Sequence, residues 1–574
     1  MFTRFHFFQA FVYIFLTLLG LGLFHTQVVK GHYFYELSKR NRIRLIPLEA
    51  PRGRVLDSMD RLLAANRPSY NVIAIPEDVT PEVYPRLARL LEMPEKLIRR
   101  RMSAGRELPF APAVIKEDIS RELAFQIEEK RTDLPGVTIR TEGVRFYPYG
   151  ETASHVIGYI GTVNEKEYEG LDHDRFGVNS KMGRAGIERA FDDLLRGWRG
   201  GEQIEVDASG QMVQVLSDRK PEPGKDIKLT LDLEFQKRIM DMIKGLHASV
   251  AVLDLDTDGL LALASAPAYD PNIFVSPASS EQRLQVLKDT NSPMLDRGIN
   301  AAYPPGSIFK LVTALAGLDL GRITPETRFN CTGSFQLGPK SKPAHCWLHE
   351  GHGSLNLYEA LERSCNVYFF NVAKRLTPDE IAHYAHVLGL GEPLKIEISR
   401  VAPGLIPDSA WKKERFNQPW FQGETLNMAI GQGYMLVTPF EILRLTAIIA
   451  KNGMVVEPHL VEQDRSMMPE APRVAIQEQN LETIKRAMLQ VVESDFGTGQ
   501  LARVDFDKLA GKTGTAQAPP LKAHSWMTGF FPYKNPKLAF VVFVEHGGSG
   551  GITSARIVKQ MLETWNGLHV TPTT

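Results

Sequence analysis

The chain has 574 residues, of which 23% are charged and 43% hydrophobic, and its 67 basic and 67 acidic side chains give a formal net charge of zero. This composition excludes a disordered chain, and the length requires two or more domains because a single core stops growing at about 250–300 residues. Without a basic excess, a zinc-finger pattern or an RNA-recognition pattern, a nucleic-acid ligand is also excluded.

An apolar segment from about residue 5 to residue 24 opens the chain and contains only three polar side chains. About 20 apolar residues in a helix span a bilayer, whereas a cleaved signal peptide has an apolar region of about 7–15 residues. No small-residue cleavage site follows, and no polar face supports the alternative of a buried soluble helix. We therefore predict that residues 1–29 form a short cytoplasmic tail and a single transmembrane anchor.

The basic residues on either side of this anchor bear on its orientation in the membrane. Arg4 precedes it, whereas five basic residues follow it: Lys30, Lys39, Arg40, Arg42 and Arg44. The positive-inside rule would then keep the bulk of the chain in the cytoplasm, although the rule is weak for long translocated domains. This count conflicts with the extracytoplasmic chemistry inferred below, so charge alone leaves the orientation open.

Residues 30–225 predict a mixed α/β domain. Helical spacing of leucines and charges occurs at Val83–Leu91 and Ile119–Lys130, between turn-rich segments. Nothing in this region combines a nucleophile, a base and an orienting group. We expect a non-catalytic structural or interaction domain.

Residues 226–566 predict an α+β domain, followed by a tail at 567–574. The boundary falls near the proline- and glycine-rich residues 221–224. Strands at both ends and a long helical middle indicate a sheet with helices on its faces. The expected strands are 226–231, 249–255, 260–264, 509–517, 526–532 and 538–545, with helices at 234–246 and 554–565.

The helical middle begins at Tyr303–Lys310, where two prolines and a glycine precede Ser307. Ser307 opens an apolar run with helical spacing, which predicts a helix start. Lys310 then lies on the same helical face, with about 5–6 Å between Cβ atoms. A hydroxyl one turn from an amine can form a serine nucleophile with a lysine base.

Three short motifs are weak evidence one by one, but their order along the chain is specific. Ser-x-x-Lys alone is expected about twice by chance, and Ser217–Lys220 is a second match without a following apolar helix. Ser364-Cys365-Asn366 follows the first motif, with a weak parallel at Ser69–Asn71, and Lys512-Thr513-Gly514-Thr515 occurs once, on a predicted strand. The ordered set is the signature of penicillin-recognising serine acyltransferases.

The chemistry suggests a role for each group. Ser307 would attack a carbonyl, and Lys310 must be neutral to accept its proton, so burial and the charge of Lys512 should lower its pKa. Ser364 would relay a proton and Asn366 would orient substrate and lysine. Lys512, Thr513 and Thr515 would bind a terminal carboxylate, with Gly514 between them, and the N–H groups of Ser307 and Thr515 would form an oxyanion hole.

Two other motifs would indicate different chemistry, but each lacks residues that its chemistry requires. A phosphate-binding loop ending at Lys512 needs a glycine where Phe506 stands. Gly547–Gly551 matches a nucleophile elbow, but only Glu563 and His569 follow it as acid and histidine.

Through these motifs the chain resembles the class B penicillin-binding proteins, in particular the elongation-type peptidoglycan D,D-transpeptidases. The resemblance covers nearly the whole chain and includes Arg52–Ala64, Gly186–Glu188, Gly431–Gly433 and Val544–Gly548. It implies that residues 30–225 are an elongated, non-catalytic pedestal of the dimerisation type and that residues 226–566 are a β-lactamase-like domain with an antiparallel sheet. It also implies D-Ala-D-Ala stem peptides as substrate, inhibition by β-lactams, and chemistry without a cofactor.

The resemblance also implies a setting and partners. The catalytic domain would lie in the periplasm, anchored in the bacterial inner membrane. The implied partners are a multi-pass glycosyltransferase of the shape-elongation-division-sporulation type and rod-shape scaffold proteins. The alternatives are a division-type transpeptidase, a D,D-carboxypeptidase, a β-lactam sensor and a catalytically idle scaffold.

The only three cysteines form a cluster with histidines nearby. Cys331, Cys346, His352 and Cys365 lie within 35 residues, and three sulfurs with one imidazole match a closed structural zinc site. The rivals are a Cys331–Cys346 disulfide or inert buried thiols, and His345 or His349 could replace His352. We expect a zinc ion that tethers the Ser364–Asn366 segment.

Overall fold

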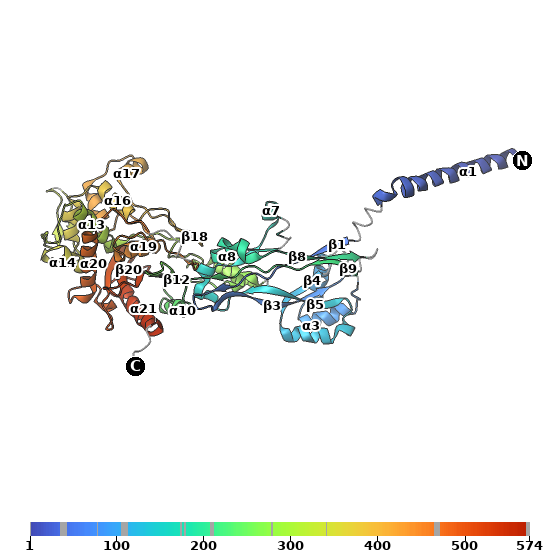
Figure 1. The fold of residues 1–574 in the computed structure, drawn as a ribbon, viewed down its shortest axis with the longest axis horizontal. Helices are drawn as coiled ribbons and strands as arrows, with labels where there is room; N and C mark the ends of the chain where they lie inside the picture. The colour runs from blue at the N-terminus through green and yellow to red at the C-terminus, as the bar shows by residue number, and fades with distance from the viewer. Residues whose placement is uncertain are drawn as a thin grey trace.

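The computed structural model describes residues 2–34, 43–76, 78–104, 113–172, 175–176, 180–206, 212–276, 279–339, 341–463 and 471–569. The molecule is elongated: an N-terminal helix lies at one end, a strand-rich pedestal in the middle, and a larger α+β domain at the other end (Figure 1). The N-terminal helix and the motif-bearing domain are therefore separated by the length of the pedestal.

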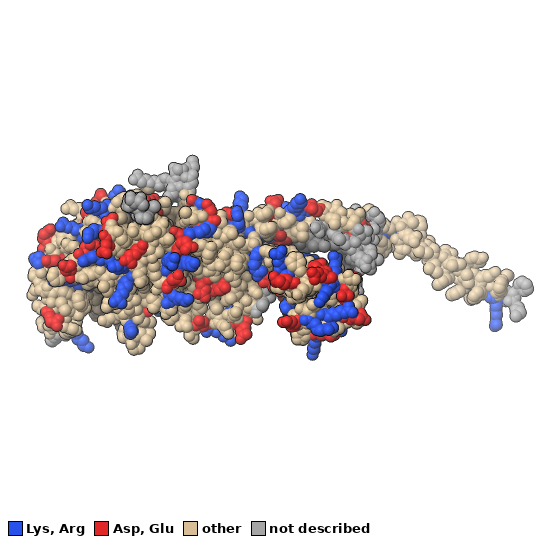
Figure 2. Space-filling view, turned by 90° about the horizontal axis from the view of Figure 1, so that it is seen from below, with Lys and Arg blue, Asp and Glu red and all other residues tan. Residues whose placement is uncertain are grey.

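The N-terminal helix matches the predicted anchor. α1 (Phe2–Phe24) continues into a π-helical turn, η1 (His25–Val29). Together they provide a 26-residue span, Arg4–Val29, with a mean hydropathy of 2.1 and no burial against the rest of the chain. Figure 2 shows this helix free of charge apart from one basic side chain near its free end, whereas both signs of charge are interspersed over the other domains. The span is long and apolar enough to cross a membrane.

The described part of the pedestal contains two main sheets and the two-stranded pair of β6 (Ile160–Thr162) and β7 (Lys181–Gly183). In the larger sheet, β3 (Leu62–Ala74) pairs with β2 (Val55–Leu56), β4 (Ala113–Ile119) and β5 (Val137–Phe146), and β10 (Ile227–Lys228) pairs with β2. Its core packs against α3 (Val83–Leu91), α4 (Glu95–Ala104) and α5 (Arg121–Glu129). The smaller sheet has the order β1 (Ile43–Leu48), β8 (Gly200–Val206), β9 (Met212–Arg219).

A buried ion network holds the end of the pedestal that meets the C-terminal domain. Glu188 is fully buried and pairs with Arg52 at 2.6 Å and Arg145 at 2.5 Å. Two residues beyond Arg145, the main chain of Tyr147 accepts a hydrogen bond from Asn272 Nδ2 at 2.9 Å and donates one to Asn272 Oδ1 at 3.0 Å. The network thus orders the segment that contacts the C-terminal domain.

The C-terminal domain is built on a five-stranded antiparallel sheet. Its order is β12 (Leu260–Ala266), β11 (Ala248–Asp254), β21 (Leu538–Val544), β20 (Leu521–Phe531), β19 (Ala510–Ala518). Alternate residues face opposite sides. Val250 and Val252 pack with α10 (Leu233–Met242) and α21 (Thr553–His569), whereas Ala251 and Leu253 belong to the core with α13 (Lys310–Asp319), α19 (Pro439–Ala450) and α20 (Glu478–Glu493).

The remaining elements are short. In the pedestal they are η3 (Arg131–Asp133), η4 (Gly150–Ala153), α6 (Ser154–Ile157), β6 (Ile160–Thr162), α7 (Glu165–Tyr168), β7 (Lys181–Gly183), α8 (Gly186–Ala190) and α9 (Asp192–Arg196). In the C-terminal domain they are α11 (Asn272–Val275), α12 (Ser280–Lys288), η6 (Gly306–Phe309), β13 (Phe329–Cys331), β14 (Ser334–Phe335), β15 (Ala344–His345), β16 (Gly353–Leu355), α14 (Leu357–Glu362), α15 (Asn366–Ala373), α16 (Pro378–Val387), β17 (Lys395–Ile396), β18 (Ser399–Arg400), α17 (Ser409–Phe416), α18 (Gln422–Ala429) and η8 (Gln500–Ala502).

Several predicted boundaries differ from the structure. The strand expected at 226–231 is reduced to β10, which joins the pedestal sheet rather than the C-terminal one. β20 begins at Leu521 rather than residue 526, because its polar first residues continue the pairing with β19. The last helix continues to His569, whose ring bonds Asp232 at 2.9 Å and so holds the helix end against α10.

Candidate active site

Ser307 lies in a 3₁₀ turn, η6, and the regular helix α13 begins only at Lys310. The helix start predicted at Ser307 is therefore confirmed to within one residue, but the first turn is 3₁₀ rather than α. Ser307 is half-exposed on the wall of a pocket, and its hydroxyl makes no hydrogen bond with any residue that the structure describes. Hydrogen bonds to a nucleophile often tighten only when substrate binds.

The turn that carries Ser307 is braced from outside. Gly306 N donates to Gly431 O at 2.9 Å, and Trp526 Nε1 donates to Pro304 O at 3.1 Å. Gly306 has a φ of +56°, and a Cβ there would lie 2.9 Å from Thr515 O. Only glycine combines this backbone conformation with so close an approach to β19.

Lys310 is fully buried and points at the second motif. Its Nζ donates to Asn366 Oδ1 at 2.7 Å, to Ser364 O at 2.8 Å and to Ser364 Oγ at 3.2 Å. Burial lowers its pKa to about 8, although the thiols of Cys365 and Cys346 act in the opposite direction. A substantial fraction of Lys310 is thus neutral near pH 8.

Ser364 bridges two lysines. Its Oγ accepts from Lys310 Nζ and also from Lys512 Nζ, at 3.1 Å, while Lys512 donates a further bond to Thr513 O at 3.0 Å. Burial, and then the charge of Lys310, hold the pKa of Lys512 well below its usual value. The sequence predicts that the charge of Lys512 lowers the pKa of Lys310. In the structure the repulsion between the two lysines instead lowers the pKa of Lys512.

Ser307, Ser364 and Asn366 line one pocket of about 840 Å³. One wall is the edge strand β19, with Thr513, Thr515 and Gln517 toward the pocket. Another part of the lining comes from the end of α18 and the loop after it: Asn427, Ile430, Gln432 and Gly433. A Cβ at Gly514 would lie 3.0 Å from Pro305 O, so this glycine lets β19 pack against the nucleophile turn.

Some pocket residues were missed from the sequence. Thr498 Oγ1 lies 2.7 Å from Thr513 Oγ1, and Asn366 Nδ2 donates to His345 O at 3.2 Å. Trp347 also lines the pocket. The Gly497-Thr498-Gly499 segment between α20 and η8 was the available signal for the first of these contacts.

The competing motifs lie elsewhere or lack partners. Ser217–Lys220 begins in β9 and Ser69–Asn71 lies in β3, both in pedestal sheets. Ser549 of the elbow motif does line the pocket. His569, the only histidine after it, instead bonds Asp232 beside the pedestal.

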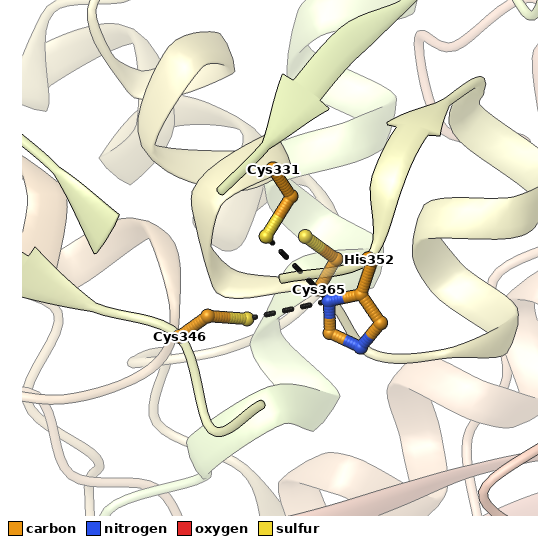
Figure 3. Close-up of side chains that lie close together, drawn as sticks. All are labelled: Cys331, Cys346, His352 and Cys365. Carbon is orange, nitrogen blue, oxygen red and sulfur yellow. Dashed lines mark hydrogen bonds between the residues drawn. The ribbon is translucent and has the colours of Figure 1, made fainter. Parts of the chain in front are cut away.

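The cysteine cluster forms a compact donor set beside the pocket (Figure 3). The Sγ atoms of Cys331, Cys346 and Cys365 and a ring nitrogen of His352 all lie within 4.8 Å of one another. All three cysteines are free and buried, so the alternative disulfide is absent. His345 and His349 do not join this set among the described residues.

The spacing of these atoms suits a tetrahedral metal ion. His352 Nδ1 lies 3.6 Å from Cys331 Sγ and 3.5 Å from Cys346 Sγ. Bonds of about 2.3 Å to sulfur and 2.0–2.1 Å to nitrogen, at tetrahedral angles, require S···N separations of about 3.5–3.6 Å. Cys365 also caps α15, accepting from Tyr368 N at 3.5 Å, whereas the hydrogen bond with Cys346 and then burial raise the pKa of Cys365.

The fold and the site define a serine acyltransferase of the penicillin-recognising class. Residues 47–229 match the penicillin-binding protein dimerisation domain, and residues 248–563 match the penicillin-binding protein transpeptidase domain. The peptidoglycan D,D-transpeptidase MrdA of Haemophilus influenzae is 32% identical over 94% of this chain and 88% of its own.

Solved structures agree. The penicillin-binding protein PBP2 of Helicobacter pylori, in complex with MreC, superposes with a TM-score of 0.82 at 27% identity, covering 92% of this chain and 99% of that one. A chain of a peptidoglycan synthase complex that couples polymerization and crosslinking superposes at 0.75 and 29% identity over 100% of both chains. The chain belongs to the penicillin-binding protein 2 (MrdA) family of class B penicillin-binding proteins. It is an elongation-type peptidoglycan D,D-transpeptidase, as the sequence resemblance predicted.

Proposed function

We propose that Ser307 is the acylated nucleophile and Lys310 its general base. The observation that carries this assignment is the single chain of polar contacts in which Ser364 Oγ joins Lys310 Nζ to Lys512 Nζ beside Ser307. Ser307 Oγ attacks the carbonyl of the penultimate D-alanine and its proton passes to neutral Lys310. The proton then returns through Ser364 to the departing amine of the terminal D-alanine, and the amine of a second stem peptide attacks the acyl-enzyme and releases Ser307.

Binding groups surround this reaction. Lys512, Thr513 and Thr515 recognise the terminal carboxylate of the donor peptide, and Asn366 orients Lys310 through the contact at 2.7 Å. The backbone N–H groups of Ser307 and Thr515 stabilise the oxyanion, a contribution typically worth about 10²–10³ in rate.

A fluorescent penicillin tests the nucleophile directly. We expect the wild-type protein to be labelled and Ser307→Ala to be unlabelled, since no oxygen remains to form the ester. Ser549→Ala is the matched control, because this serine lines the same pocket, and it should label normally. A label that survives Ser307→Ala would move the nucleophile elsewhere, and an unlabelled wild type would favour the idle scaffold.

The rate of this acylation should depend on pH through Lys310. Its pKa of about 8 means that only about a tenth is neutral at pH 7. The rate should therefore rise about tenfold per pH unit below 8 and level off above it. Stopped-flow acylation between pH 6 and pH 10 measures this, and a rate that falls as the pH rises through 8 would exclude a lysine base.

We further propose that Cys331, Cys346, His352 and Cys365 hold a structural zinc ion. Its support is the donor set itself, three thiols and one imidazole at tetrahedral spacing. The ion would fix Cys365 and thereby the flanking Ser364 and Asn366, without entering the chemistry.

We also propose a setting for the protein: the bacterial inner membrane, with Arg4–Val29 as the single span and the catalytic domain in the periplasm. Stem peptides are its substrates and β-lactams its inhibitors. A multi-pass glycosyltransferase and rod-shape scaffold proteins are the proposed partners, supported by the relatives' complexes with MreC and within a synthase. Protection of the catalytic domain from protease added to spheroplasts would contradict this topology.

A further inference from the structure

A cluster of three aromatic rings, two of them exposed, lies next to the part of the pocket lining that α18 and the loop after it provide. Trp411, Phe416 and Tyr434, here called the aromatic cluster, have ring centroids 5.2–5.6 Å apart. Phe416 is 45% exposed and Tyr434 is 39% exposed. Tyr434 directly follows Gly433, the last residue of that part of the lining. The cluster is therefore continuous with the catalytic pocket.

The cluster is held on an ordered scaffold. Asp408 caps α17 by accepting from Trp411 N at 2.6 Å, and Asn417 ends the helix in the left-handed conformation with a φ of +52°. An ion pair between the buried Lys412 and the partly exposed Glu424 joins α17 to α18. Exposed apolar rings fixed in this way are typical of binding sites.

The rim of the cluster is polar and weakly basic. Lys413 and Arg415 lie exposed in the last turn of α17, and neither makes an ion pair with any residue in the described ranges. Glu414 between them offsets one of the two charges. The surface thus offers aromatic faces beside cationic donors. This combination suits a polymer of uncharged sugar rings whose side branches carry carboxylates.

Two parts of the pocket lining divide the two substrates of a transpeptidase. β19 is the edge strand of the sheet, so an extended donor peptide can lie along it, with its carboxylate at Thr513 and Thr515, which line the pocket next to the buried Lys512. The amine of the second strand must then approach Ser307 from the remaining side. The pocket lining away from β19 includes the segment that leads to Tyr434.

We infer that the aromatic cluster binds the acceptor strand, an N-acetylated amino-sugar polymer with peptide side branches. Pyranose rings present apolar C–H faces that stack on aromatic rings, and the cationic rim meets the carboxylates of the stem peptides. The inference rests on the proposed function, because it assigns the donor to β19. It makes Phe416 and Tyr434 determinants of acceptor recognition.

The test separates the two substrates. Full-length protein is first acylated with penicillin, which blocks the donor side, and its affinity for soluble, uncross-linked glycan strands with intact stem peptides is then measured. Phe416→Ala and Tyr434→Ala should each weaken binding about tenfold, the loss typical of one buried aromatic anchor. Tyr434→Phe keeps the ring and should bind nearly as the wild type does.

The control is Phe125→Ala on α5 of the pedestal, an aromatic that is 55% exposed and distant from the pocket, and it should not change binding. All variants should be labelled by penicillin within twofold of the wild-type rate, which also shows that they fold. If Phe416→Ala and Tyr434→Ala both bind glycan strands as tightly as the wild type, the inference is wrong, even if the cluster binds a protein instead. Failure of the proposed function appears separately, as missing penicillin label or as label that survives Ser307→Ala.

Discussion

Lys310→Met should slow acylation of Ser307 by about 10²–10⁴-fold, the usual contribution of a general base. Methionine fills a similar volume but cannot accept the proton of the attacking hydroxyl. The second-order rate constant for a chromogenic cephalosporin measures the effect. The pH dependence predicted for the wild type should disappear as well, because the group that titrates near pH 8 is gone.

A second lysine provides the control for this experiment. Lys485 on α20 is also buried, at 8% exposure, and contacts Asn452 at 2.9 Å outside the pocket. Lys485→Met should lose stability but retain acylation. Lys310→Met leaves Asn366 Oδ1 and Ser364 O without their donor, at about 1–3 kcal/mol for each buried group, so thermal unfolding must be followed in parallel. An acylation rate near the wild-type value in folded Lys310→Met would assign the base elsewhere, with Lys512 the nearest candidate.

Zinc removal should have the second largest effect. Protein purified without a histidine tag should contain about one zinc ion per chain, since a closed site takes one ion. Cys346→Ser should lose the metal and slow acylation on the order of 10²-fold, because small displacements of catalytic groups cost that much. Metal analysis, thiol titration and penicillin acylation measure the three consequences.

His349→Ala is the matched control, because this histidine lies in the same loop but outside the donor set. It should keep both the metal and the acylation rate. A Cys331–Cys346 disulfide found by mass spectrometry, or a metal-free protein with full acylation, would contradict the zinc site.

Local patterns in the sequence were sufficient to predict several helices and the residues of the candidate site. The helix at Val83–Leu91 has the predicted bounds, because leucine spacing is a short-range feature. The anchor, the three ordered motifs and the donor set around Cys365 were also readable. In each case residue type and spacing carry the chemistry without any knowledge of the fold.

Only the tertiary structure decided how these parts meet. Ser364 lies between lysines that are 54 and 148 residues away, and no periodicity encodes such contacts. The 3₁₀ turn of Ser307 is held by a hydrogen bond from Gly306 N to the carbonyl of Gly431, which is distant in the chain. The spacing of neighbouring residues therefore could not predict the 3₁₀ form of this turn.

The electrostatics of the site depend on packing in the same way. Full burial is what lowers the pKa of Lys310 to about 8, and burial is a property of the whole domain rather than of a segment. The sequence by itself determined which groups the site contains. The fold decided their distances, their charge states and the part of the pocket lining that leads to Tyr434, because these depend on contacts between segments far apart in the chain.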